Sequence, residues 1–207
     1  PNLVSDIIVD SPDLIITVDN GISSIAGVSE ARRLGIPVLI TDHHLPGSKL
    51  PDAAAMVNPN LSDSDFSSKH LAGVGVAFYL MAALGQALES GGVKGAAKIA
   101  ATYLDLVALG TIADVVTLDY NNRILVSQGL QRRQAGKAVQ GIQSLLKKAG
   151  RALRCTAVAE PSSCAHCIVE NIGLRDVTTI DVCNSSSIIF CNTWADKLIF
   201  TANCLMS

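Results

Sequence analysis

Short apolar runs alternate with segments of helical period along the first 150 residues of the chain. The runs at 14–18 and 37–41 are continuous and aliphatic, and polar residues follow both. Strands buried on both faces of a parallel sheet have this pattern. Between them, residues 23–34 predict a helix that Ser23 or Ser24 begins and Gly35 ends. Strand, helix and strand together predict a βαβ unit.

A third, shorter strand is predicted at 55–57, before Asn58-Pro59. The pattern then becomes mainly helical, with one helix reaching about Ala108 and leading into a turn that holds Asp114. Two amphipathic helices follow within 121–150. We therefore predict an α/β fold, a parallel doubly wound sheet with helices on both faces, followed by a helical segment and an unassigned tail.

Charge and cysteine divide the chain into three predicted segments: 1–120, a sheet domain; 121–154, a basic helical segment; and 155–207, an unassigned cysteine-rich tail. Residues 121–154 hold eight bases and no acid, whereas all six cysteines lie in the last 53 residues. The basic block either attracts phosphates or forms a solvated helix face. The tail's CAHC has no second CxxC pair, so we interpret it as incidental rather than as a zinc site.

Polar side chains follow the predicted strands where they end. Asp19 comes directly after the first strand, and Asp42, His43 and His44 follow the next. In open α/β sheets, ligands bind beyond the carboxyl ends of the strands, and successive strands place these ends close together. Mixed carboxylate and imidazole donors suit Mn²⁺, Mg²⁺, Fe or Zn²⁺. We therefore predict a metal site at this edge, with Asp114 as a further ligand.

Each of these residues also has a plainer interpretation. Asp19 can cap the following helix and Asp114 can be a turn residue; taken singly, both are better explained that way. Asp-His-His after a strand is the sharper signal. His70 has no motif around it, and we predict that it is a surface residue.

Six segments, taken in order, resemble the catalytic core of the DHH-family phosphoesterases, and within that family the single-strand-specific 5′→3′ DNA exonucleases. The resemblance covers about residues 10–150 and implies a hydrolase that cleaves phosphodiester bonds in DNA repair and recombination. The segments are TVDNGI, ITDHHLPG, VNPN, LAGVGVAFYL, LVALGTIADVVTL and NNRIL.

The resemblance implies roles for particular residues. Asp19, His43 and Asp114 would bind metal, as part of a site for two Mn²⁺ or Mg²⁺ ions in the parent enzyme. His44 would lie close to the scissile phosphate, and Asp42 would orient an imidazole, as carboxylates behind ligating histidines do. The basic residues expected to hold nucleic acid are Arg123, Arg132 and Arg133.

The implied partner is single-stranded DNA, together with replication and repair proteins, and the implied parent is monomeric. No signal peptide and no apolar run of bilayer length is found in the sequence, so we expect a cytoplasmic protein without membrane contact. The chain begins without methionine, which favours a start within a longer protein.

Two departures from the family pattern lead to further expectations. No Asp-x-Asp pair precedes Asp19, so part of the carboxylate set is absent and the first strands of the sheet with it. We therefore expect an exposed apolar sheet edge and little or no nuclease activity from this chain. The family's second domain is not recognisable after Arg154, where we expect an out-of-frame or otherwise unrelated continuation.

Two other functions remain open. Another DHH phosphoesterase would hydrolyse pyrophosphate, a cyclic dinucleotide or a short oligonucleotide with the same fold. A non-catalytic DHH domain would serve as a protein-binding platform. The presence of Asp19, His43, His44 and Asp114 argues against the platform.

Overall fold

A computed structural model describes residues 2–7, 9, 11–148 and 199–201 of the chain. Two compact units are distinguished by their internal contacts. The first comprises Pro1–Lys69 and Ala195–Ser207, and the second comprises His70–Trp194. Most of the predicted tail, with its cysteines, lies outside the described residues, so the composition-based division at residues 120 and 154 stays a prediction.

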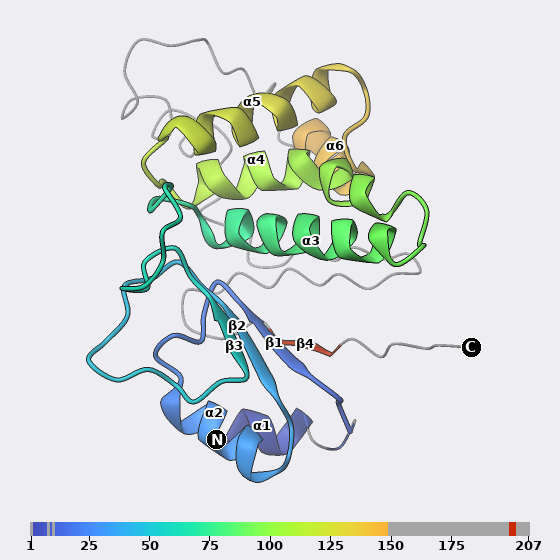
Figure 1. Ribbon diagram of the computed structural model, residues 1–207. Coiled ribbons are helices and arrows are strands. Elements are labelled where there is room, and N and C mark those ends of the chain that lie inside the picture. The colour runs from blue at the N-terminus through green and yellow to red at the C-terminus, as the bar shows by residue number, and fades with distance from the viewer. Residues whose placement is uncertain (1, 8, 10, 149–198, 202–207) are drawn as a thin grey trace. The chain divides into compact units, whose positions relative to one another are not determined.

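The first unit is built on the predicted βαβ pattern (Figure 1). Strands β1 (Ile15–Val18), β2 (Val38–Thr41) and β3 (Ala55–Val57) are parallel, and Ile15 lies opposite Val38. Helix α2 (Ile25–Arg33) connects β1 to β2. Ser24 is the residue before its first turn, although the serine side chain makes no capping hydrogen bond. The predicted strands are confirmed to within one residue.

A fourth strand corrects the expectation of an open sheet edge. Strand β4 (Ile199–Thr201) pairs antiparallel with β1, so the strand order is β3-β2-β1-β4 and the sheet is mixed rather than wholly parallel. An unpaired strand edge presents free N–H and C=O groups that favour pairing with another segment. In this chain Ile199–Thr201, far along the sequence, pairs with Ile15–Thr17 at that edge.

One hydrophobic cluster holds the first unit together. Helix α1 (Asn2–Ile7), which the sequence pattern did not predict, contributes Val4. Helix α2 contributes Val28 and Ala31, which pack with buried side chains of β1 and β2. This packing fixes the strands whose carboxyl ends carry Asp19 and the Asp-His-His triplet.

The second unit is helical (Figure 1). Helix α4 lies between α3 and α5. It continues to Ala113, five residues beyond the predicted end, so Asp114 directly follows a helix. The elements of this unit are α3 (Gly73–Ser90), the 3₁₀ turns η2 (Ala96–Lys98) and η3 (Ala100–Tyr103), α4 (Leu104–Ala113), α5 (Tyr120–Gln134) and α6 (Gln140–Lys148).

One stretch of this unit, Ala96–Ala113, has the length and mean hydropathy (18 residues, 1.4) of a membrane-spanning helix. The chain there forms η2, η3 and α4 in succession. Ile112 packs against Leu118 and Val126 inside the unit. The end of this apolar stretch therefore belongs to the hydrophobic core of the unit.

Candidate metal centre

Asp19 occupies the first position after β1, where the backbone turns sharply. Its φ of 60° is in the left-handed region, which aspartate tolerates better than most residues. Gly21 follows with φ 116°, and a Cβ there would lie 2.4 Å from the Thr17 hydroxyl oxygen. Only glycine therefore fits the turn that leads from Asp19 into α2.

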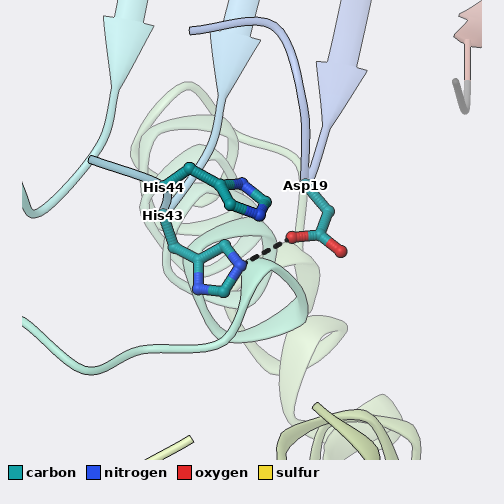
Figure 2. Close-up of side chains that lie close together, drawn as sticks. All are labelled: Asp19, His43 and His44. Carbon is teal, nitrogen blue, oxygen red and sulfur yellow. Dashed lines mark ion pairs between the residues drawn. The ribbon is translucent and has the colours of Figure 1, made fainter. Parts of the chain in front are cut away.

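His43 and His44 follow β2 at the same edge of the sheet and lie beside Asp19 (Figure 2). His43 Nε2 is 2.9 Å from Asp19 Oδ1. One potential ligand atom from each of the three residues lies within 4.8 Å of the others. The structure thus brings Asp19 together with His43 and His44, which the order of the strands placed at the same sheet edge.

Asp42 is the buried centre of this loop, with 1% of its side chain exposed. Its Oδ1 accepts hydrogen bonds from the backbone N–H groups of His43 (2.8 Å) and His44 (3.1 Å), and its Oδ2 accepts one from Ile22 (2.9 Å). One carboxylate therefore ties the loop after β2 to the loop after β1. The charge on a buried carboxylate is stabilised by such multiple N–H donors.

The same carboxylate also faces an imidazole: His44 Nδ1 lies 2.7 Å from Asp42 Oδ1. Because an ionised carboxylate only accepts hydrogen bonds, this contact requires a proton on Nδ1 and leaves the lone pair of a neutral ring on Nε2. The expectation that Asp42 orients an imidazole stays a prediction, and His44 is the ring that the geometry favours.

The donor set fits a divalent transition metal. One hard carboxylate and two borderline imidazoles together suit Mn²⁺, Fe²⁺ or Zn²⁺. Asp19 and His44 are 48% and 62% exposed, whereas His43 is 13% exposed. A ligand approaching from solvent can reach such a centre.

Asp114 belongs to the second unit, where it is the C-cap of α4. Its membership in the metal site therefore stays a prediction. Val115, the next residue, has φ 56°. A β-branched residue in this region is strained, and such strain concentrates at functional positions.

Replacing Val115 with glycine is expected to stabilise the fold by about 1 kcal/mol, because glycine adopts a left-handed helix end without steric cost. Val115 is 52% exposed, so little packing is lost. Urea unfolding of the two chains measures the difference. A glycine variant less stable than the parent would contradict the expectation.

The three predicted nucleic-acid arginines already have partners within the second unit. Arg123 Nη1 donates to Leu118 O (2.8 Å), and Arg132 Nη2 donates to Lys137 O (3.3 Å). Arg133 lines a small cavity between α4, α5 and α6. These contacts give the arginines a structural role, and phosphate binding stays a prediction. His70 is exposed, as predicted.

Sequence reasoning missed the part that Asn58 and Asn60 play here. It treated Asn58-Pro59 as the end of a strand. Both side-chain amides donate to backbone carbonyls of the histidine pair. An Asn-Pro-Asn turn directly after a strand was the available signal, since asparagine commonly bonds to nearby backbone.

Comparison with known proteins identifies the family of the chain. The model for the N-terminal domain of the DHH family matches residues 1–111. The single-stranded-DNA-specific exonuclease RecJ of Salmonella typhimurium is 58% identical over 155 residues, which are 73% of this chain and 27% of that protein. RecJ of Thermus thermophilus is 39% identical over 150 residues, 72% of this chain and 21% of that protein.

Solved structures show the same relationship. A crystal structure of exonuclease RecJ bound to manganese matches with a TM-score of 0.63 at 30% identity, over 83% of this chain and 48% of that chain. The crystal structure of Thermus thermophilus RecJ in complex with Mn²⁺ matches with a TM-score of 0.61 at 30% identity, over 83% of this chain and 28% of that chain.

The chain belongs to the DHH family. Within that family it is homologous to part of RecJ, the single-stranded-DNA-specific exonuclease, and it spans about a quarter of the length of the Salmonella relative.

Proposed function

We propose that this chain contributes the metal-binding DHH part of a RecJ-type exonuclease, which hydrolyses single-stranded DNA from its 5′ end. The observation that carries the proposal is the cluster of Asp19, His43 and His44 at the carboxyl ends of β1 and β2. The names of the relatives support the substrate, and the manganese in two related structures supports the metal.

In this proposal Asp19 and His43 hold a Mn²⁺ ion, with Asp114 as a further ligand. A bound ion would supply Lewis-acid activation of water and would neutralise charge on the phosphate. Asp42 keeps the Nδ1 proton of His44 in place, so the Nε2 lone pair faces outward toward the phosphate or the ion. The open side of the cluster, where Asp19 and His44 are exposed, would admit the DNA backbone.

The proposed substrate has consequences for location and partners. Hydrolysis of single-stranded DNA in repair and recombination would take place in the cytoplasm of a bacterium, by a monomeric parent enzyme that meets replication and repair proteins. Similarity to several RecJ sequences favours this substrate over pyrophosphate, cyclic dinucleotides or very short oligonucleotides. The clustered donors of the first unit favour a metal site over a non-catalytic binding platform.

The 207-residue chain itself should hydrolyse DNA slowly. Its described cluster holds one carboxylate, whereas a two-metal centre uses bridging carboxylates to keep ions about 3.5–4 Å apart. We therefore expect Mn²⁺ binding without rapid release of mononucleotides.

The test has two parts. Calorimetry of the full chain with Mn²⁺ should show binding, and its absence would contradict the proposed site. Incubation with 5′-labelled single-stranded DNA and Mn²⁺ should give little product. Processive release of mononucleotides, abolished by His43→Ala, would overturn the expected inactivity while supporting the site itself.

A further inference from the structure

The segment directly after β3 contacts the backbone of both histidines of the candidate metal centre. Asn58 Nδ2 donates to the carbonyl oxygen of His44 (2.9 Å). Asn60 Nδ2 donates to the carbonyl oxygen of His43 (2.6 Å). Two neighbouring carbonyl groups are thus held by two side-chain amides from one short turn.

These amides act where the parallel ladder between β2 and β3 stops. Asp42 N, directly after β2, donates to the carbonyl oxygen of Val57, the final residue of β3, at 3.0 Å. In a parallel ladder every second residue of a strand bonds to the neighbouring strand, so after Val57 the next donor would be residue 59. That residue is Pro59, which has no N–H to donate. The asparagine side chains therefore supply hydrogen bonds to the histidine loop where the proline backbone cannot.

The turn itself is held from two directions. Asn58 is 4% exposed, and its Oδ1 accepts from Asn60 N at 2.8 Å, which closes the turn around Pro59. Lys69 Nζ donates to Pro59 O (2.6 Å) and to Ser64 O (2.8 Å). A chain of hydrogen bonds therefore runs from Lys69 through the turn to the carbonyl groups of His43 and His44.

We propose that Asn58, Pro59 and Asn60 form a positioning device for the paired histidines, with Asn60 fixing His43 and Asn58 fixing His44. This inference rests on the proposed metal site. Asp42 holds the N–H groups of the two histidines from one side, and the asparagines hold their C=O groups from the other. A backbone bound on both sides restricts the directions in which the imidazoles can point.

The positioning device also accounts for the short distance between the side chains of His43 and Asp19. His43 Nε2 and Asp19 Oδ1 are 2.9 Å apart although they come from loops 24 residues apart in the chain. Preorganised ligands lose less conformational freedom when an ion binds. Without the Asn60 amide, the His43 peptide can rotate, and part of this advantage is lost.

Asn60→Ala is the variant that tests the inference, because Asn60 is only half-buried and its loss should leave the unit folded. We expect the Mn²⁺ affinity of the full chain, measured by calorimetry, to fall about tenfold, the lower end of the range for groups that support metal ligands. Lys69→Met, which removes the bonds to Pro59 O and Ser64 O but no bond to the histidine loop itself, should lower the affinity less.

A matched control lies in the same loop. Ser64 Oγ accepts from Phe66 N (3.4 Å) and has no hydrogen bond to the described histidine loop. Ser64→Ala should therefore bind Mn²⁺ like the parent. If Ser64→Ala and Asn60→Ala lost the same amount of Mn²⁺ affinity, the cause would be a general loosening of the loop. That result would overturn the positioning role of Asn60.

A second measurement needs no metal. In NMR spectra of the metal-free chain, the ring resonances of His43 should shift or broaden in Asn60→Ala and stay unchanged in Ser64→Ala, while His70 serves as an internal reference. Unchanged His43 resonances would overturn the inference, whatever the Mn²⁺ affinity. If the parent binds no Mn²⁺ but these resonances move as expected, the metal site fails and the positioning of the histidines stands.

Discussion

Replacing Asp19 with asparagine is expected to lower the Mn²⁺ affinity of the chain by more than about 100-fold, since even residues behind metal ligands are worth 10–100-fold. Asp19 is the carboxylate of the described cluster, and its Oδ1 lies 2.9 Å from His43 Nε2. Asparagine keeps the size of the side chain and tolerates the left-handed backbone of this position. The loss should therefore come from the negative charge and from the replacement of one carboxylate oxygen by an amide NH₂ group.

Asp13→Asn is the matched control for this prediction. Asp13 is exposed and precedes β1, so the substitution removes the same charge from the opposite end of the same strand. Titration of each variant with Mn²⁺, followed by calorimetry or by the spectrum of free Mn²⁺, gives the two affinities. Similar affinities for Asp19→Asn and Asp13→Asn would show that Asp19 is not a ligand.

Replacing Gly129 with alanine is expected to destabilise the second unit by about 3 kcal/mol, at the upper end of the usual cost of overpacking. Gly129 lies on α5 where that helix crosses α4. A Cβ at this position would lie 2.2 Å from Leu104 O and 2.5 Å from Ala108 Cβ. Because the nearer of these atoms is a backbone oxygen, the two helices must move apart to admit the methyl group.

Gly27→Ala, in α2, provides the comparison. A Cβ at Gly27 meets nothing within 4 Å, so alanine should stabilise that helix by about 0.5–1 kcal/mol through its higher helix propensity. Urea unfolding monitored by circular dichroism measures both variants. If the Gly129→Ala variant were as stable as the Gly27→Ala variant, the close packing of α4 against α5 described above would be contradicted.

The sequence predicted the strands well for a local reason. Continuous aliphatic runs as short as the one that forms β2 are too short for a helix. When helical segments separate such runs, they indicate buried strands. Helix α4 was predicted less well, because Gly110 lowers helix propensity near its end. A Cβ on Gly110 would lie 2.8 Å from a Val74 methyl group, so tertiary packing selects glycine here and keeps the helix intact.

The site was predicted in part. Strand order alone brings Asp19 and His43 to one sheet edge, and the distance of 2.9 Å agrees with that expectation. No local pattern indicated that Asp42 would bond to His44, because the choice between two adjacent rings depends on side-chain rotamers. The hydrogen bonds from the 58–60 turn to the histidine loop could not be predicted from the sequence either, since they depend on a contact between two loops.

The sequence by itself determined the strands, the connecting helix and the kinds of donor atoms at the strand ends, because each depends on residues a few positions apart. Only the tertiary structure decided which groups meet. It paired β4 with β1, brought Asp42 Oδ1 into contact with His44 Nδ1, and placed the asparagine amides against the histidine carbonyl groups. These contacts join residues from separate loops or distant segments, or depend on a rotamer, so their partners are selected by the packed fold rather than by local preference.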